Sequence, residues 1–408
     1  MSVTLFDVQE ARRRIQDAIR VTPCTYSELL SQLCGCEVYC KLEHLQHTGS
    51  FKERGVCNAL ERLSTEEKQR GVIAASAGNH ALALAYHGHR LHIPVVVVMP
   101  RFAPLIKQER CRQAHAELVL HGECFEDARM RAVEIARHRG LRYVHGYDDP
   151  EIIAGQGTIG LEVLEQCPDA DAVLVPIGGA GLAAGVSLVI KELCPEIEVI
   201  GIEPERAASF SAAVAAGHPV RFDVQPTLAD GLAVNQVGEL AFQIARQHVD
   251  HTVLVDEQSI ALAVVRLMEL EKSVIEGAGA APLAALIGNR LPELAGKRVI
   301  LLQCGSNIDL SILNRLIETG LVASGRLTRF VATISDRPGG LAHFAALIAD
   351  IGASIMDVAH DRVFAGPDVT SVNVLCTVET RNAAHIDELF QRLADSGIRH
   401  RRLDRPSP

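Results

Sequence analysis

Short runs of apolar, largely β-branched residues recur from about residue 74 to residue 302, and each leads through a glycine-containing turn into an amphipathic stretch. The clearest runs cover residues 71–75, 94–99, 116–120, 172–176, 199–202 and 298–303. Their apolar positions are continuous rather than alternating, which is typical of strands buried on both faces. Such strands, alternating with helices, predict an α/β fold in which helices cover both faces of parallel sheets.

The pattern changes after residue 320. Here we expect four strands, at residues 327–334, 355–360, 369–378 and 398–403, and two helices, at residues 341–351 and 383–394. The resulting order, βαββαβ, is that of a ferredoxin-like α+β domain, and the segment is long enough to fold around a core of its own. The sequence therefore predicts two domains, residues 1–325 and residues 326–408.

The composition narrows the class of protein. Of the 408 residues, 48% are hydrophobic and 22% are charged, as in soluble globular proteins. The formal net charge of -10 argues against a nucleic-acid partner, because phosphate binding depends on positive charge. The apolar run at residues 93–99 is far too short to cross a bilayer, and no secretory signal is evident. We therefore expect a cytoplasmic protein without a membrane partner.

The cysteines raise the question of a metal site. Eleven cysteines in a chain without an export signal predict reduced thiols. Cys34, Cys36 and Cys40 lie close together, but they lack the paired spacing of a zinc site and no matching second half follows. We expect them to be buried structural residues.

Lys52 is the first residue suited to chemistry. It follows a glycine-containing turn and an aromatic residue, Phe51, at the expected start of a helix. A lysine in this position can present its amine to a carbonyl cofactor. By itself this is weak evidence, since most lysines at helix starts are solvated charges.

Two turns between a strand and a helix predict anion sites. In the first, from Ser76 to Asn79, exposed amide N–H groups at a helix N-terminus suit a carboxylate, although an ordinary capped turn is the alternative. The second turn is glycine-rich, so its backbone can wrap around a phosphate. Its residues are Gly178, Gly179, Ala180, Gly181 and Leu182. The pattern G-G-x-G-L does not match a dinucleotide fingerprint, and a monophosphate is the better ligand.

A fourth segment, residues 302–307, again runs from a strand end into a glycine turn. Its Cys304 is a neutral side chain that can share a hydrogen bond with an aromatic nitrogen. Taken alone, a buried structural cysteine is the simpler explanation.

Taken together, the four segments resemble the fold-type II enzymes that use pyridoxal 5'-phosphate (PLP), specifically the threonine/serine dehydratase group. The resemblance covers residues 5–320 and includes connecting stretches at residues 97–100, 103–107, 153–158 and 228–231. It implies a two-subdomain body like tryptophan synthase β, with a smaller subdomain at about residues 48–147 inserted in the larger one. The C-terminal segment, residues 326–408 with the motif at residues 336–341, looks like an ACT domain, an amino-acid-sensing module. This pair of domains is typical of threonine ammonia-lyases.

The resemblance also implies roles for single residues. Lys52 would carry PLP as a Schiff base and act as the base, with Phe51 packed close to the cofactor ring. Asn79 would hold the ring's phenolic oxygen, and Cys304 would lie at the pyridine nitrogen. The substrate carboxylate would bind at Ser76 and its neighbours. The phosphate would be cradled by Gly178, Gly179, Ala180, Gly181 and Leu182.

The implied reaction converts L-threonine to 2-oxobutanoate and ammonia by α,β-elimination, with L-serine as a second substrate and isoleucine biosynthesis as a setting. A neutral Cys304 at the ring nitrogen favours elimination over transamination, because the leaving group discharges the carbanion at once. The alternatives are a serine or 3-hydroxyaspartate dehydratase, or a serine racemase. Racemases of this group have a serine where this chain has Ala77, which cannot move protons, so the sequence favours elimination.

The resemblance extends to regulation and metal binding. An amino-acid effector would bind the turn that holds Asp336, Gly339 and Gly340, between paired domains of a homodimer or homotetramer; a domain that only promotes oligomerisation is the alternative. Relatives carry a divalent-cation site for which Glu203 is the weak candidate here. The third ligand position corresponds to Ser209, a poor ligand for a hard cation, and we expect no metal.

Overall fold

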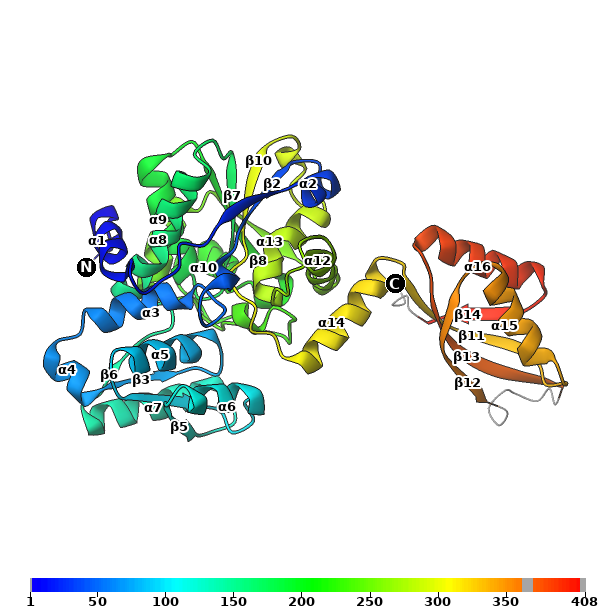
Figure 1. Ribbon diagram of the computed structural model, residues 1–408, viewed down its shortest axis with the longest axis horizontal. Coiled ribbons are helices and arrows are strands. Elements are labelled where there is room, and N and C mark those ends of the chain that lie inside the picture. The colour runs from blue at the N-terminus through cyan, green and yellow to red at the C-terminus, as the bar shows by residue number, and fades with distance from the viewer. Residues whose placement is uncertain (1, 362–369, 404–408) are drawn as a thin grey trace. The chain divides into compact units, whose positions relative to one another are not determined.

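The computed structural model describes residues 2–361 and 370–403. The chain divides into two units, Met1–Leu310 and Ser311–Pro408, which are treated separately below (Figure 1). The sequence suggested a boundary at residue 325, whereas this division comes at the start of helix α14 (Leu310–Ala323).

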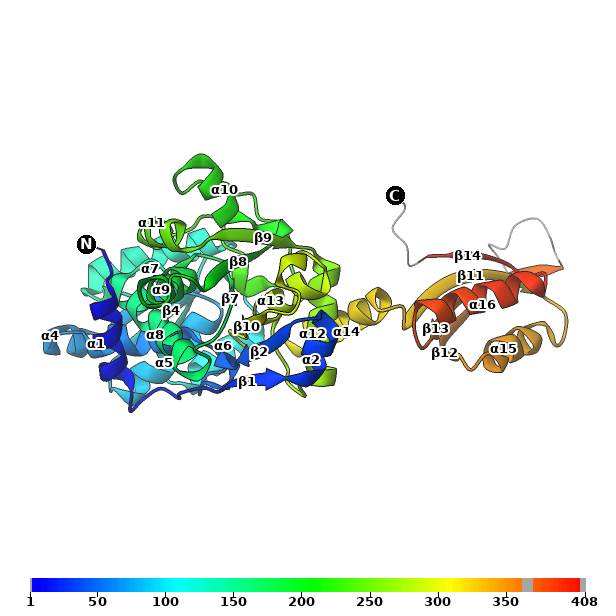
Figure 2. The same cartoon turned by 90° about the horizontal axis from the view of Figure 1, so that it is seen from above.

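A six-stranded sheet forms the centre of the first unit. Its strands lie in the order β1 (Cys24–Ser27), β2 (Glu37–Lys41), β10 (Arg298–Leu302), β7 (Ala172–Pro176), β8 (Glu198–Pro204) and β9 (His251–Val255). Neighbours are parallel except β1 and β2. Helices α8 (Pro150–Gln166) and α9 (Gly181–Leu193) lie on one side of the sheet, and α12 (Glu257–Leu270) and α13 (Gly277–Ile287) on the other (Figures 1 and 2). This confirms the predicted α/β architecture.

A four-stranded parallel sheet lies within the predicted smaller subdomain, in the order β5 (Glu117–Leu120), β4 (Val95–Met99), β3 (Val72–Ala75) and β6 (Arg142–Tyr143). Alternate residues of β3 and β4 face opposite sides. Val72 and Val97 pack with helices α3 (Lys52–Glu61) and α5 (Asn79–Arg90), while Ile73 and Val96 pack with α7 (Phe125–Arg139). Burial on both faces explains why these strands are continuously apolar.

Further helices and 3₁₀ turns complete the described part of the first unit. The helices are α1 (Leu5–Ile15), α2 (Glu28–Cys34), α4 (Thr65–Arg70), α6 (Leu105–Gln113), α10 (Ser209–Ala216) and α11 (Glu239–His248). Four 3₁₀ turns are η1 (Glu43–Leu45), η2 (Glu205–Ala207), η3 (Asp230–Leu232) and η4 (Pro292–Leu294).

Helix α3, which begins with Lys52, packs closely on α8. A Cβ added at Gly155 of α8 would lie 2.5 Å from the Cα of Gly55 in α3, so neither position accepts a side chain without movement. Next to this contact, Arg54 is fully buried and donates to both Glu43 and Glu162. Lys41 donates to Glu162 at 2.6 Å and completes a buried cluster of two acids and two bases. These contacts fix the helix that presents Lys52.

The second unit has the predicted βαββαβ order. Its antiparallel sheet runs β12 (Ser354–Asp361), β13 (Ser371–Glu379), β11 (Leu327–Ser335) and β14 (Arg399–Arg402), with helices α15 (Gly340–Asp350) and α16 (Ala383–Asp395). Phe330, Phe344 and Leu389 belong to a core of its own. The sequence placed the start of the third strand at residue 369, which lies outside the described residues.

Two expectations about the whole chain can be compared with the described residues. Within residues 2–361 and 370–403, no helix is both long and apolar enough to span a membrane. All eleven cysteines are free thiols. Cys36 and Cys40 are buried, as expected for structural residues, and Cys34 is half-buried. In the same described ranges, no three His, Cys, Asp or Glu side chains gather as a metal-binding group.

Candidate active site

The four segments singled out in the sequence meet at one cavity of about 880 Å³. Three of them follow the carboxyl ends of β3, β7 and β10, and the fourth is the start of α3. Ligand sites of α/β proteins commonly lie at such strand ends. The cavity is lined by every residue to which the sequence assigned a catalytic or cofactor-binding role: Phe51, Lys52, Ser76, Asn79, Gly178, Gly179, Ala180, Gly181, Leu182 and Cys304.

Backbone hydrogen bonds join the turn before Lys52 to the loop that holds Cys304. The amide of Phe51 donates to the carbonyl of Cys304 at 3.0 Å, and the amide of Ser306 donates to the carbonyl of Gly49 at 2.9 Å. Ser50 and Gly305 form an antiparallel bridge between these contacts. The two segments are distant in sequence, so this pairing brings lysine and thiol to the same cavity.

The surroundings of Lys52 favour the neutral form of its amine. Burial disfavours its ammonium form and lowers its pKa to about 8, although Cys304 and Glu276 act in the opposite direction. Its Nζ donates to the carbonyl of Gly146 at 2.7 Å and lies 5.0 Å from the centre of the Phe51 ring. A lysine with a lowered pKa supplies a neutral nucleophile near neutral pH, which a carbonyl cofactor requires.

The turn from Ser76 to Asn79 opens helix α5 toward the cavity. Ser76 Oγ accepts from the amide of Gly78 at 3.2 Å, and this shapes the turn. Gly78 is the N-cap residue of α5, and no side chain at this position accepts a hydrogen bond from the amides of the first turn. Unpaired amides at the positive end of a helix suit a carboxylate.

The glycine loop forms a second anion site between β7 and α9. Ala180 has φ of +70°, a left-handed conformation that is unusual for alanine, and no side chain caps the helix that follows. A Cβ at Gly179 would lie 2.3 Å from the Tyr147 ring, so a side chain there would displace the ring that packs on the loop. The buried loop therefore offers backbone N–H groups alone, which suits a phosphate.

Cys304 keeps its proton. It is 2% exposed, and burial, reinforced by the nearby Glu276 carboxyl, raises the pKa of the thiol well above its usual range. A neutral thiol neither donates a full proton to a ring nitrogen nor repels its lone pair.

Two polar residues that contact Asn79, Glu276 and Asn307, had no predicted role. Glu276 is 4% exposed and accepts a hydrogen bond from Asn79 Nδ2 at 2.7 Å. Burial raises its pKa to about 7, and Asp230 adds to this effect. Asn307 donates to Asn79 Oδ1 at 2.9 Å. The one available signal was a lone acid in the apolar, small-residue stretch from Val274 to Ala281, where burial of a carboxyl needs a partner.

Glu203, the weak cation candidate, already has protein partners. Its carboxylate accepts from the amides of Phe210 at 2.7 Å and Ser211 at 2.9 Å, at the start of α10, and from the Ser211 hydroxyl at 2.5 Å. Two helix amides and one hydroxyl therefore already donate to the two oxygens of this carboxylate.

The predicted regulatory residues lie at the turn between β11 and α15. Gly339 has φ of +94° at the N-cap of α15. A Cβ at Gly340 would lie 2.0 Å from the carbonyl oxygen of Ser335, and the amide of Asp336 donates to the carbonyl of Thr370 at 3.0 Å. The turn thus requires glycine for steric reasons, and its effector role stays a prediction.

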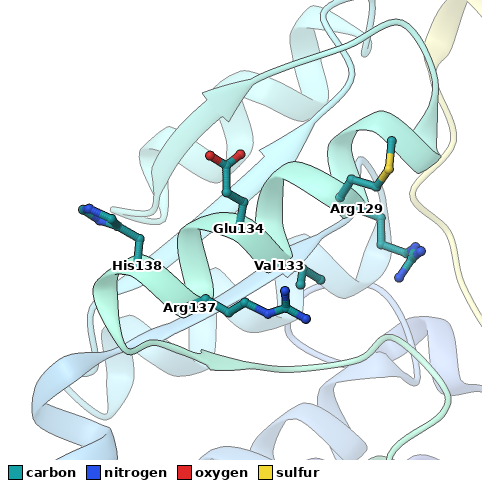
Figure 3. Close-up of a pocket in the computed structure, with 6 residues that line it drawn as sticks. Arg129, Val133, Glu134, Arg137 and His138 are labelled. Carbon is teal, nitrogen blue, oxygen red and sulfur yellow. The ribbon is translucent and has the colours of Figure 1, made fainter.

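A second concavity, of about 670 Å³, lies on the outer face of α7 (Figure 3). All six lining residues belong to this single helix: Arg129, Met130, Val133, Glu134, Arg137 and His138. None of them was predicted as a site residue, and the cavity at the strand ends is the candidate active site.

An amine of lowered pKa, two backbone anion sites and a neutral thiol around one cavity fit PLP, which carries an aldehyde, a phosphate and a pyridine nitrogen. A family model described as "Pyridoxal-phosphate dependent enzyme" matches residues 15–305. The chain belongs to this family, and PLP is its cofactor.

The chain is also similar to individual proteins of known name or structure. The chain is 42% identical over 395 residues to the L-threonine ammonia-lyase of Thermotoga maritima, covering 97% of this chain and 98% of that one. Among solved structures, the processed form of threonine deaminase isoform 2 from Solanum lycopersicum is 36% identical with a TM-score of 0.74, covering 77% of this chain and 92% of that one. Serine racemase from Dictyostelium discoideum is 35% identical with a TM-score of 0.72, covering 76% and 100%.

Proposed function

We propose that the protein converts L-threonine to 2-oxobutanoate and ammonia by PLP-dependent elimination of water, and that it also acts on L-serine. The similarity to an L-threonine ammonia-lyase across 97% of the chain carries this proposal. The geometry of the cavity supports it, because an amine of lowered pKa, two backbone anion sites and a neutral thiol line the same space.

The assignment of residues follows their surroundings. Bound PLP supplies an electron acceptor for the α-carbon. Lys52 would hold the cofactor and, as a neutral amine, take the α-proton. The β-hydroxyl would leave as water with a proton from the cofactor phosphate, and the released enamine would lose ammonia by hydrolysis. The amides from Ser76 to Asn79 bind the substrate carboxylate, and residues 178–182 bind the phosphate of PLP. Cys304 would face the ring nitrogen of bound PLP as a neutral partner, and Asn79 would donate to its phenolic oxygen.

Ala77 separates this proposal from its main alternative. The similarity to a serine racemase at 35% identity makes racemisation the second candidate. A racemase needs a second proton-transfer group on the opposite face of the α-carbon, and an alanine methyl cannot serve. A serine or 3-hydroxyaspartate dehydratase would share every step, so only substrate preference distinguishes them.

The test of the cofactor lysine uses borohydride. Wild-type protein loaded with PLP should lose its visible absorbance and retain the cofactor covalently after reduction, whereas Lys52→Ala should release it. Lys107→Ala is the matched control, since Lys107 also lines the cavity and should leave covalent capture intact. Capture of PLP by Lys52→Ala would contradict the assignment.

The test of the substrate compares kcat/KM for L-threonine, L-serine and 3-hydroxyaspartate, with chiral analysis of the remaining serine. One methyl group is worth about 1–3 kcal/mol, so a preference for threonine of roughly tenfold or more is expected. Formation of D-serine faster than oxo acid would favour the racemase instead.

We further propose that the second unit is an ACT-like regulatory domain of a homo-oligomeric, cytoplasmic enzyme, with an amino-acid effector at Asp336, Gly339 and Gly340. The βαββαβ order and the glycine turn before α15 support this assignment. Isoleucine, valine and threonine should be titrated against the full-length enzyme while its mass is followed by sedimentation. Unchanged kinetics together with loss of the oligomer in a chain ending at Gly325 would mean that the domain only promotes assembly.

A further inference from the structure

The side-chain amide of Asn79 is held from both sides by residues that come from other parts of the chain. Its Nδ2 donates to Glu276 Oε1 at 2.7 Å, and its Oδ1 accepts from Asn307 Nδ2 at 2.9 Å. Asn79 begins α5, Glu276 is the N-cap of α13, and Asn307 follows β10. Three segments therefore meet at one amide on the wall of the cavity.

The orientation of Asn307 follows from partners that have a single hydrogen-bonding role. Its Nδ2 donates to the backbone carbonyl of Thr48 at 2.7 Å, and a carbonyl can only accept. Its Oδ1 accepts from Arg110 Nη1 at 3.0 Å, and a guanidinium can only donate. Turning the Asn307 amide over would oppose oxygen to oxygen and nitrogen to nitrogen, so only one orientation satisfies both partners.

The orientation of Asn79 follows in turn. Because Asn307 presents an N–H group, Asn79 must present its oxygen to it, and its nitrogen then points to the Glu276 carboxyl. That carboxyl is confined by the loop before Asn307, since a Cβ at Gly305 would lie 2.3 Å from Glu276 Oε1. Of the two N–H groups of Asn79, one is used by Glu276. The other has no acceptor among residues 2–361 and 370–403.

We propose that Asn307 and Glu276 are positioning residues that hold the Asn79 amide in a single orientation, so that its remaining N–H is offered to the phenolic oxygen of PLP. The inference rests on the proposed placement of Asn79 at that oxygen. An unrestrained amide would present its oxygen or its nitrogen, and binding would have to select one of them. The network makes that choice in advance, so the amide would need no reorientation when PLP binds.

Asn307→Asp tests the role of Asn307. The substitution has the same size and keeps an oxygen for Arg110, but it removes both N–H donors and places a carboxylate against Asn79 Oδ1. We expect the ratio of the two absorption bands of bound PLP to change, because the hydrogen bond at the phenolic oxygen sets that ratio. We also expect kcat/KM for L-threonine to fall about tenfold or more, the effect of one lost hydrogen bond.

A double-mutant cycle separates positioning from a general structural role. In an Asn79→Ala background, Asn307→Asp should change neither the band ratio nor kcat/KM further, because the amide that it orients is absent. Ser306→Ala is the matched control, since it removes a hydroxyl from the same loop without contacting Asn79; its spectrum should match that of the wild type. Asn307→Ala provides a second variant if the aspartate variant does not fold, with melting temperatures recorded for all proteins.

The outcomes distinguish this inference from the proposed function. Wild-type bands in both Asn307 variants, or effects that add fully to Asn79→Ala, would overturn it. A wild-type protein that binds PLP but forms no oxo acid from threonine would refute the proposed substrate, while the band ratios would still decide the role of Asn307.

Discussion

Glu162 offers a direct test of how the helix that carries Lys52 is held in place. Its carboxylate accepts three charged hydrogen bonds, from Arg54 Nη1 at 2.7 Å, Arg54 Nη2 at 2.8 Å and Lys41 Nζ at 2.6 Å. Glu162 is 3% exposed, and Glu43, Arg54 and Lys41 are all within 1% of full burial. With two acids and two bases, the cluster is electrically balanced.

Replacing Glu162 by glutamine leaves two buried bases against one acid. The amide keeps the shape and one acceptor, but its NH₂ group must face a donor. Breaking a buried pair from one side costs about 3–5 kcal/mol, because the remaining charge is uncompensated. The unit spans Met1–Leu310, so an unfolding entropy of about 2.1 cal/mol/K per residue converts this loss into a fall in melting temperature of roughly 5–8 °C.

Calorimetry on the PLP-loaded protein measures this change, with Glu165→Gln as the matched control. Glu165 lies on the same helix and pairs with Arg12, but the two side chains are 55% and 37% exposed. An exposed pair contributes about 0–1 kcal/mol, so the control should melt close to the wild type. If Glu162→Gln were no less stable than Glu165→Gln, the buried cluster would not be what anchors α3.

Three further predictions concern separate sites. The rate at which apo-protein captures PLP covalently should rise with pH and level off above about 8, because the lowered pKa of Lys52 makes its neutral amine abundant there. A rate that keeps rising toward the ordinary lysine pKa of 10.5 would contradict this. Mg²⁺ or a chelator should leave kcat/KM and the melting temperature unchanged, since helix amides already donate hydrogen bonds to the Glu203 carboxylate. A rise in melting temperature of several degrees with Mg²⁺ would refute this prediction. Gly340→Ala should destabilise the second unit by about 1–3 kcal/mol in calorimetry, because its Cβ would lie 2.0 Å from the Ser335 carbonyl; an unchanged transition would show that the turn can relax.

Local signals in the sequence predicted the continuously apolar strands and the segments that line the cavity, but not strands β1, β2, β6 and β9. Continuous apolar runs predicted β3, β4 and β7 because strands buried on both faces need no polar positions. Glycine turns after strand ends located the anion sites, since the N-terminus of the following helix is adjacent in the chain. Lys52 alone was weak evidence for a cofactor site, and its role as the cofactor lysine was predicted only in combination with these turns.

The tertiary structure alone decided which polar groups act on one another. Asn79 and Glu276 are 197 residues apart in the sequence, and Asn79 and Asn307 are 228 apart, so no local pattern could pair them. Arg54 and Glu162 are 108 residues apart, and in the sequence each is indistinguishable from an ordinary charged surface residue. Hydrogen-bond direction and desolvation depend on neighbours brought together by folding, and these set the pKa of Lys52 and the orientation of the Asn79 amide.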